Sequence, residues 1–296
     1  MKVMVTGAGG MVGRAVVAHC TAQRESVAAF DHHTLDIADE LSLNATFERE
    51  RPDVLINCAA WTDVDGCEDD PQYANKVNAL GPELLAIACR KIGAQLITIS
   101  TDYVFDGEKD GFYTQQDQPN PQSAYGVSKL EGERRAQLAC ANAIVVRSGY
   151  IFGPGGKNFL STVIARARRG EDIRAISDSF GTPTYAPHLA RQLYRLSQIN
   201  VPGIYHVVNA GEGASFEGFA RCALETAGLD ESRLTTVRLR DLRRPAPRPR
   251  NSRLRCMRSE AIGLEPLPQW QDAVCEFITT DSPERLAGSP TPFDAF

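Results

Sequence analysis

Hydrophobic positions in the first half of the chain follow two alternating periods. Short apolar and β-branched runs end in Gly, Asn or Ser, and longer stretches with apolar residues three and four apart lie between them. This alternation predicts a parallel sheet with helices on both faces. The predicted strands are 2–6, 26–30, 54–57, 95–100 and 143–147, and the predicted helices are 11–22, 38–50, 71–92 and 122–139.

The pattern loosens in the second half of the chain. A glycine- and proline-rich loop at 153–156 precedes a predicted helix over 158–169. Further predicted strands cover 173–176 and 203–208, and further predicted helices cover 187–198 and 215–227. The Pro- and Arg-rich segment 243–255 cannot form a regular helix, because proline removes a backbone donor. We therefore expect a smaller, less regular second part.

A glycine-rich loop joins the first predicted strand to the first predicted helix. Gly7, Gly10 and Gly13 recur at every third residue. A sharp turn, a close approach of the backbone to a diphosphate and tight packing of the helix each require a residue without a Cβ. The N–H groups at the start of the helix then bind the anion. The loop thus predicts a dinucleotide site.

Asp31 supports the dinucleotide site. It lies 18 positions after Gly13, close to the ~20 expected for a carboxylate that binds the adenine ribose. A carboxylate there favours NAD(H), because it repels a 2′-phosphate, although the two histidines that follow Asp31 soften this bias. We therefore expect either NADH or NADPH as cofactor.

These features define the predicted domains. We expect an α/β protein of the Rossmann type, a doubly wound parallel sheet with a smaller C-terminal lobe. Residues 1–150 would form the NAD(P)-binding domain, rejoined by about 180–208. Residues 151–179 and 209–296 would form the substrate-binding lobe.

Tyr125 and Lys129 are the candidate catalytic pair. Their spacing of four places a phenol and an ammonium on one helix face. A nearby cation favours the phenolate and lowers the tyrosine pKa from about 10, so the phenol can protonate a carbonyl oxygen as hydride reaches the carbon. Lys129 can also hold the nicotinamide ribose. Thr101 follows a predicted strand, where ligands of open α/β sheets bind, and is placed to hydrogen-bond the carbonyl.

A family resemblance follows from these motifs and from seven longer ones. RPDVLINCAAWTDVD, STDYVFDG, YGVSKLEGE, GKNF, GTPTYAPHLA, GIYH and RPRNSRL occur in this order. With the glycine loop and the Tyr-x-x-x-Lys pair, the chain resembles the extended short-chain dehydrogenase/reductase superfamily. Within it, roughly residues 1–275 resemble the dTDP-4-dehydrorhamnose reductase family.

The resemblance implies a reaction and a set of residues. The family reduces the C4 ketone of dTDP-4-dehydro-L-rhamnose to dTDP-L-rhamnose with NADPH or NADH. Its Thr, Tyr and Lys triad matches Thr101, Tyr125 and Lys129. Its cofactor residues match Gly10, Met11, Val12, Asp31, Asp36, Ile37, Ala60 and Thr62, to which the loops add Gly7, Gly13 and Ala59, and the catalytic pair adds Tyr125 and Lys129.

The expected substrate residues come from several segments. The resemblance implies that Thr101 and Asp102 touch the sugar, and that Tyr150 stands where the family commonly has Trp. Asn158, after the second glycine loop, is a candidate for contact with sugar or phosphate. Guanidinium groups suit diphosphate oxygens, so the basic segment supplies Arg250 as a further candidate.

Charge and cysteine usage limit the remaining ligand classes. The chain has 32 Lys and Arg against 37 Asp and Glu, a net charge of −5, which argues against nucleic acid and anionic membranes as partners. No apolar run reaches the ~18 residues of a membrane span, and the N-terminus lacks the features of a signal peptide. The eight scattered cysteines predict no metal site. We expect a cytoplasmic protein with a nucleotide-sugar substrate, and a homodimer is the assembly considered.

Two alternative functions remain open at this stage. Tyr150 and Gly66 depart from the family pattern and leave room for a sister reductase that acts on another nucleotide-linked 4-keto-6-deoxysugar. A non-catalytic, cofactor-binding regulatory subunit, similar to that of methionine adenosyltransferase, would share the fold.

Overall fold

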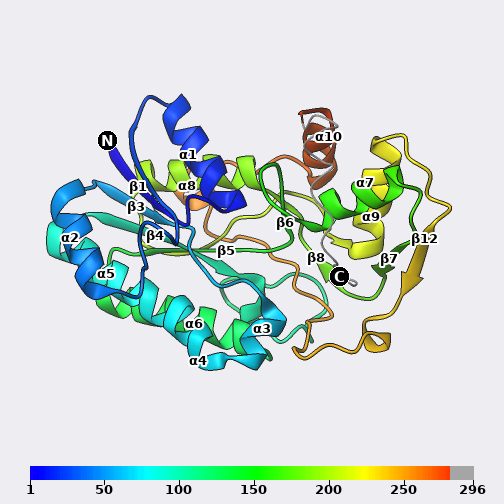
Figure 1. Cartoon of the computed structure of the whole chain (residues 1–296), viewed down its shortest axis with the longest axis horizontal. Coiled ribbons are helices and arrows are strands. Elements are labelled where there is room, and N and C mark those ends of the chain that lie inside the picture. Colours follow the sequence, from blue (N-terminus) through cyan, green and yellow to red (C-terminus); the bar gives the residue numbers. More distant parts are fainter. Residues whose placement is uncertain (281–296) are drawn as a thin grey trace.

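A six-stranded parallel sheet organises the computed structural model, which describes residues 1–280 (Figure 1). Its order is β10-β5-β4-β3-β1-β2, and every neighbouring pair is parallel. The strands are β1 (Lys2–Thr6), β2 (Ser26–Phe30), β3 (Val54–Asn57), β4 (Gln95–Thr101), β5 (Ile144–Ser148) and β10 (Gly203–His206). The predicted parallel α/β fold is confirmed.

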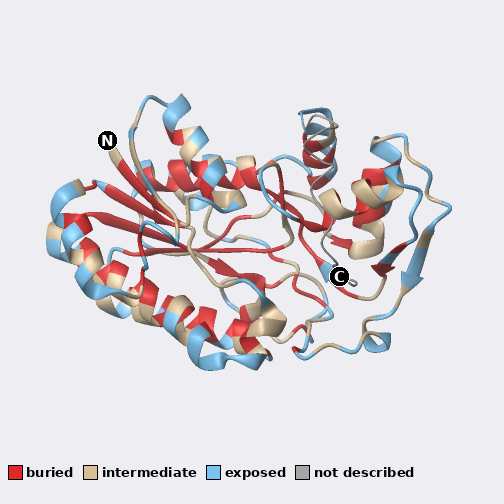
Figure 2. Cartoon of the chain, viewed as in Figure 1, coloured by how far each residue is buried: buried red, intermediate tan, exposed pale blue. Residues whose placement is uncertain are grey.

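Helices cover both faces of this sheet (Figure 1). On one face α1 (Met11–Ala22) packs against α8 (Ala186–Ile199), and on the other α5 (Gly81–Ile92) packs between α2 (Glu40–Glu50) and α6 (Ala124–Ala139). Successive side chains of a strand point to opposite faces, so Val3 and Val5 join one apolar cluster while Met4 joins the other. The central strands are consequently buried on both sides (Figure 2).

The single helix predicted over 71–92 is divided into three segments. These are α4 (Pro71–Asn75), a π-helical turn (Lys76–Leu80) and α5. Pro82 has no N–H to donate to the carbonyl of Asn78, which disfavours a continuous α-helix at this point. That carbonyl lies against α6, where a Cβ on Gly132 would be 2.0 Å from it. A further short helix, α3 (Val64–Asp69), precedes this region.

The second lobe has its own aromatic core. Phe152, Phe219 and Phe277 are fully buried in it. Its helices are α7 (Phe159–Arg168), α9 (Phe216–Thr226) and α10 (Trp270–Thr280). Its paired strands are β6 (Ile151–Phe152) with β9 (Thr184–Tyr185), β7 (Ile173–Ile176) with β12 (Leu234–Val237), and β8 (Phe180–Gly181) with β11 (Ala214–Ser215). Short 3-10 turns are η2 (Asp102–Val104), η3 (Leu239–Asp241) and η4 (Glu260–Ile262).

The chain returns to the large sheet between its two excursions into the second lobe. Helix α8 packs on α1, and β10 pairs with β5. The preceding strands β8 and β9 pair instead with strands of the second lobe. We therefore propose that the return begins at α8, slightly later than the expected residue 180. Residues 281–296 of the expected lobe lie outside the described residues.

A buried ion pair joins α6 to β5. Arg147 donates two hydrogen bonds to the carboxylate of Glu133, at 2.9 and 2.7 Å. The two side chains are only 3% and 2% exposed. Removal of one partner from such a pair leaves an uncompensated charge in a low-dielectric environment. The pair therefore fixes the position of α6, which also carries Tyr125 and Lys129.

We predict that Glu133→Gln lowers the free energy of unfolding by about 3 kcal/mol, because it leaves the Arg147 charge buried without a counter-ion. Urea denaturation measures this change. Glu131→Gln is the matched control, since the Glu131–Arg135 pair on the same helix is about one-third exposed and should contribute below ~1 kcal/mol. Equal losses in both variants would contradict the prediction.

Candidate active site

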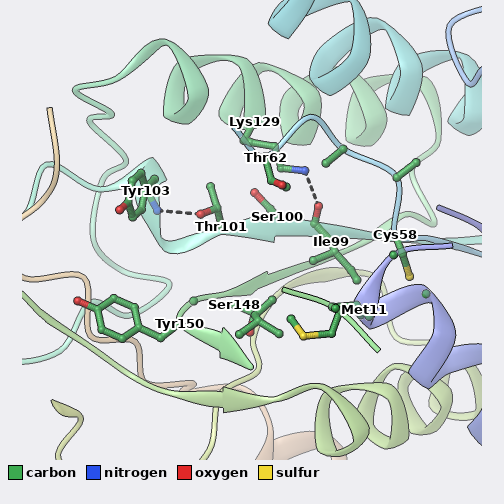
Figure 3. Close-up of a pocket in the computed structure, with 18 of the residues that line it drawn as sticks. Met11, Cys58, Thr62, Ile99, Ser100, Thr101, Tyr103, Lys129, Ser148 and Tyr150 are labelled. Carbon is green, nitrogen blue, oxygen red and sulfur yellow. Dashed lines mark hydrogen bonds between the residues drawn. The ribbon is translucent and has the colours of Figure 1, made fainter. Parts of the chain in front are cut away.

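A cavity of about 580 Å³ opens at the carboxyl ends of the central strands. The strand order reverses between β1 and β3, and open α/β sheets bind ligands at such a reversal. The lining comes from the glycine loop, the segment after β3, the end of β4, helix α6 and the segments 148–151 and 155–157. Figure 3 shows these segments meeting around one space.

The glycine loop has the backbone geometry that a diphosphate site requires. Gly7 has a φ of +68°, and a Cβ there would lie 2.6 Å from the backbone nitrogen of Ala59. A Cβ on Gly13 would lie 2.1 Å from the Gly7 carbonyl oxygen. Gly10 is the N-cap of α1, and it lines the cavity together with Met11, Val12 and Gly13. Backbone N–H groups at a helix start attract anions, so these residues fit a dinucleotide.

Asp31 lies beside the glycine loop. A Cβ on Gly9 would be 3.4 Å from the Asp31 Cβ. The Oδ1 atom of Asp31 accepts hydrogen bonds from the Thr34 hydroxyl at 2.9 Å and from the backbone nitrogens of His33 and Thr34 at 3.0 Å. These hydrogen bonds hold the Asp31 pKa below its ordinary value. An ionised carboxylate is therefore fixed next to Gly9, which lines the cavity, although Asp31 itself does not line it.

Asp36 and Ile37 occupy different surroundings from those expected. Asp36 is exposed and lies 3.8 Å from the ammonium of Lys76. Ile37 is 4% exposed and belongs to the core beneath α5. Neither side chain lines the cavity. Apolar packing of Ile37 against Gly81 accounts for its inward direction.

Asn78 positions the segment after β3, a role that the sequence analysis missed. Its side chain accepts a hydrogen bond from the Trp61 nitrogen at 2.8 Å and donates to the Trp61 carbonyl at 3.0 Å. Ala59, Ala60 and Thr62, which flank Trp61, line the cavity as expected. The sequence signal that could have indicated this role was an Asn between apolar residues, just before Gly81 and Pro82.

Thr101, Tyr125 and Lys129 converge on this cavity. All three line it, and they are 5%, 8% and 5% exposed. The Lys129 ammonium donates a hydrogen bond to the Ile99 carbonyl at 2.8 Å, and the Thr101 hydroxyl accepts one from the Tyr103 nitrogen at 3.2 Å (Figure 3). The expected grouping of a phenol, an ammonium and a hydroxyl is present.

The electrostatics of this group differ from the sequence-based expectation. Burial raises the Tyr125 pKa above its ordinary value of 10, and a hydrogen bond with Thr101 opposes part of the rise. Lowering of this pKa by Lys129 was predicted, and that prediction is wrong because desolvation is the larger effect. Burial also lowers the Lys129 pKa to about 8. Tyr125 is therefore a phenol at neutral pH, able to donate a proton.

A second cavity of about 620 Å³ adjoins the first. Both are lined by Thr62, Asp102, Tyr150 and Lys157, among others. Tyr150 has a φ of +45°, and its ring stacks on Phe216 with the centroids 4.3 Å apart. This aromatic pair forms a flat wall in the second cavity. Phe216 was missed, because no motif connects it with Tyr150.

Asn158 is primarily a helix cap. Its Oδ1 accepts from the Ser161 nitrogen at the start of α7. Its amide nitrogen donates to the carbonyls of Gly153 and Gly156 at 2.9 and 3.2 Å. The residue lines the second cavity, but these bonds already engage the side chain. We therefore propose that Asn158 mainly fixes the conformation of the 153–156 loop before α7.

The basic segment contributes different arginines from the one expected. Arg250 is exposed and lines neither cavity, whereas Arg244 and Arg248 line the second. The Arg248 guanidinium is held by the Asp65 carboxylate at 2.9 Å. This ion pair, which joins α3 to the basic segment, directs Arg248 toward the cavity. Spacing within the segment could not reveal its long-range partner.

Membrane-spanning helices and metal-binding clusters are both absent from residues 1–280. None of the helices in this part of the chain has the length and apolar content that crossing a membrane requires. Within the same residues, no three His, Cys, Asp or Glu side chains gather in a way that would hold a metal ion.

Comparisons with known proteins place this site in a family. Residues 1–282 match the family model described as RmlD substrate binding domain. The dTDP-4-dehydrorhamnose reductase of Mycolicibacterium smegmatis is 39% identical over 291 residues, 95% of this chain and 88% of that protein. A Streptomyces antibioticus protein named a probable dTDP-4,6-dihydroxy-2-methyloxan-3-one 4-ketoreductase is 35% identical over 294 residues, 99% of this chain and 98% of that protein.

A solved structure agrees with this placement. The structure of dTDP-4-dehydrorhamnose reductase from Bacillus anthracis in complex with NADP has a TM-score of 0.91 and 30% identity, and covers 95% of this chain and 99% of that chain. The similarity extends through both lobes. On these grounds the chain belongs to the dTDP-4-dehydrorhamnose reductase family, described as RmlD substrate binding domain.

Proposed function

We propose that this protein reduces the C4 ketone of dTDP-4-dehydro-L-rhamnose to dTDP-L-rhamnose with NADPH or NADH. It is an NAD(P)H-dependent oxidoreductase of the family established above. The observation that carries the proposal is the convergence of Thr101, Tyr125 and Lys129 at the glycine-loop cavity, which shares Asp102 and Tyr103 with the second cavity. The M. smegmatis relative supports the choice of sugar.

The proposed roles follow from burial and position. The nicotinamide cofactor, when bound, supplies the hydride. Tyr125 donates a proton to the ketone oxygen, since its raised pKa keeps it protonated at neutral pH. Thr101, at the end of β4, orients the carbonyl. The Lys129 ammonium holds the ribose and stabilises the negative charge left on Tyr125 in a low-dielectric site.

The second cavity fits the rest of a nucleotide-sugar. Arg244 and Arg248 would bind the diphosphate, because guanidinium groups match its oxygens. Tyr150 and Phe216 present an aromatic wall to a ring. Asp31 would bind the adenine ribose of the cofactor and favour NADH. Cytoplasmic location and a homodimer stay predictions from the sequence, and light scattering of the purified protein tests the second.

One alternative has a specific observation in its favour. The S. antibioticus relative carries the name of a ketoreductase for a different dTDP-linked substrate and matches this chain over nearly its full length. A panel of nucleotide-linked 4-keto sugars, each assayed by the loss of nicotinamide absorbance, separates the two substrates. A purely regulatory role is disfavoured, because the three candidate catalytic side chains are buried together at the cavity.

We predict that Tyr125→Phe lowers turnover about 10³-fold, because the proton donor is lost. Affinity for NADH, measured by nicotinamide fluorescence, should change less than twofold. Tyr73→Phe is the control, since Tyr73 is 48% exposed and lies outside both cavities. Near-normal turnover in Tyr125→Phe would refute the assignment of Tyr125.

We predict that the stability difference between wild type and Lys129→Met depends on pH. Burial lowers the Lys129 pKa from 10.5 to about 8. Between these values the unfolded chain holds a proton that the folded protein has lost, so this contribution to the free energy of unfolding rises with pH. Urea denaturation from pH 8 to 10.5 should therefore favour wild type increasingly. Lys76→Met is the control for removing an exposed lysine, and a pH-independent difference for Lys129→Met would contradict burial of its charge.

We predict that Arg248→Met raises the KM for the nucleotide-sugar about tenfold, because a charge-assisted hydrogen bond to the diphosphate is lost. The KM for NADH should stay unchanged. Arg243→Met is the matched control, since Arg243 is exposed and lines neither cavity. Arg250→Met, assayed in parallel, tests the residue that the sequence suggested. An unchanged KM in Arg248→Met would remove Arg248 from the substrate site.

A further inference from the structure

The RPRNSRL segment, residues 248–254, passes behind the proposed catalytic cavity. The function proposed above gives most of this segment no role. Its backbone is fixed against β8, because the Ser252 nitrogen donates to the Phe180 carbonyl at 2.7 Å and the Phe180 nitrogen donates to the Arg250 carbonyl at 2.8 Å. The Leu254 nitrogen donates to the Thr182 hydroxyl at 3.0 Å. The segment is therefore held in one register.

On its other side the segment is fixed to the loop after β4. The Asn251 amide nitrogen donates to the carbonyls of Lys109 and Gly111, at 2.6 Å each. The Tyr113 nitrogen donates to the Arg253 carbonyl at 2.7 Å. With both sides held, the short side chain between Asn251 and Arg253 has a defined direction.

That side chain is Ser252, and its hydroxyl donates to the Oδ2 atom of Asp102. Ser252 is 1% exposed and lines neither cavity. The other acceptor within reach, the Phe180 carbonyl, is 3.5 Å away. The contact therefore reaches Asp102 from behind, on the side away from the cavity lining.

Asp102 is enclosed on its remaining sides. It is buried, and its Oδ1 atom accepts a hydrogen bond from the Thr101 hydroxyl at 3.1 Å. A Cβ on Gly149 would lie 2.4 Å from Oδ2, so the backbone of Gly149 closes one face. Burial raises the Asp102 pKa to about 6, and the hydrogen bonds from Ser252 and Thr101 oppose that rise. A carboxylate so placed has one orientation.

Thr101 completes a connected series of groups. Its hydroxyl lies 3.1 Å from the Asp102 Oδ1 atom, accepts a hydrogen bond from the Tyr103 nitrogen and interacts with the Tyr125 phenol. The orientation of Asp102 thus sets the orientation of the Thr101 hydroxyl beside the proposed proton donor. Ser252 is the only member of this series that comes from the C-terminal segment and touches neither cavity.

We infer that Ser252 is a positioning residue for the reduction, which it supports by fixing the Asp102 carboxylate and, through it, the Thr101 hydroxyl beside Tyr125. The inference rests on the proposed function. It gives Ser252, in the Asn251-Ser252-Arg253 sequence, a role other than phosphate binding, which only arginines would supply. It also ties the C-terminal segment to the proton-transfer site through side chains.

The alternative is a purely structural role, in which Ser252 only hydrogen-bonds a buried carboxylate and stabilises the segment. Thr182→Val separates the two. Thr182 is equally buried and holds the same segment through the Leu254 nitrogen, but it lines neither cavity. A structural effect would appear in both variants, whereas a positioning effect would appear only at Ser252.

The experiment measures kcat and both KM values for wild type, Ser252→Ala, Ser252→Thr and Thr182→Val, with NADH and dTDP-4-dehydrorhamnose. Ser252→Ala should lower kcat about tenfold, the size expected for one lost hydrogen bond to a charged group, with the KM for NADH unchanged. Ser252→Thr should restore most of the loss, and Thr182→Val should keep kcat within twofold of wild type. A normal kcat in Ser252→Ala, or an equal loss in Thr182→Val, overturns the inference.

A second measurement needs no turnover, so it stays informative if the proposed substrate is wrong. Carbon-13 NMR of labelled aspartate carboxyls follows the titration of Asp102, whose pKa is about 6. The tyrosines that interact with its charge, Tyr103, Tyr125 and Tyr150, all have pKa values raised above 10 and do not titrate in this range. Loss of the Ser252 donor should move the Asp102 midpoint to higher pH, because it removes a hydrogen bond to the ionised form.

The two measurements separate the possible failures. Wild-type inactivity toward the sugar with a shifted Asp102 midpoint refutes the proposed function but keeps the Ser252–Asp102 contact. Wild-type activity with an unmoved midpoint in Ser252→Ala refutes the positioning role alone. Ser252→Thr, which keeps the hydroxyl, should leave the midpoint close to that of wild type, and a shift as large as that of Ser252→Ala would also count against the role.

Discussion

A buried ammonium on helix α6 is the constraint on which the site depends. Lys129 lies out of solvent, and its charge is held by the Ile99 carbonyl and by the field of Glu133, one turn further along the same face. Glu133 is in turn paired with Arg147 on β5. Charges in a low-dielectric interior persist only when they are paired or hydrogen-bonded. The face of α6 that carries the proposed catalytic residues is therefore stabilised by a polar series that continues into the sheet.

This polar series explains why α6 departs from an ordinary amphipathic helix. Tyr125, Lys129 and Glu133 are spaced by four residues and are all buried. The face that packs on the sheet thus carries a phenol and two charges where an apolar stripe is usual. Small residues allow the close approach this needs: a Cβ on Gly126 would lie 2.3 Å from the Tyr103 carbonyl oxygen. The residues that pack α6 on the sheet and the proposed catalytic residues therefore share one face.

The second lobe acts on the site in two ways. Its cavity, with Tyr150, Phe216 and Arg248, offers an aromatic wall and positive charge to a nucleotide-sugar. Its C-terminal segment also reaches back to Asp102 through Ser252. The long-range contact between Asp65 and Arg248 joins the lobes on the other side of the cavity. The second lobe therefore contacts both the proposed substrate cavity and the proposed proton-transfer site.

The sequence by itself determined the local features. Hydrophobic periodicity defined the strands and helices of the sheet, and the spacing of Gly7, Gly10 and Gly13 defined a loop whose conformation a side chain would obstruct. The spacing of Tyr125 and Lys129 placed them on one face. Apart from the approach of Ala59 to Gly7, these features depend on interactions between near neighbours in the chain, which a sequence displays directly.

Only the tertiary structure decided what depends on distant partners. The sign of the Tyr125 pKa shift followed from burial, which no spacing reveals, and it reversed the expected effect of Lys129. The position of Arg248, rather than Arg250, at the second cavity followed from Asp65, nearly two hundred residues away in the chain. Ser252 contacts Asp102, 150 residues away in the chain, and Asn78 contacts Trp61, 17 residues away. Desolvation and ion pairing depend on the folded surroundings of a group, and those exist only after the chain has assembled.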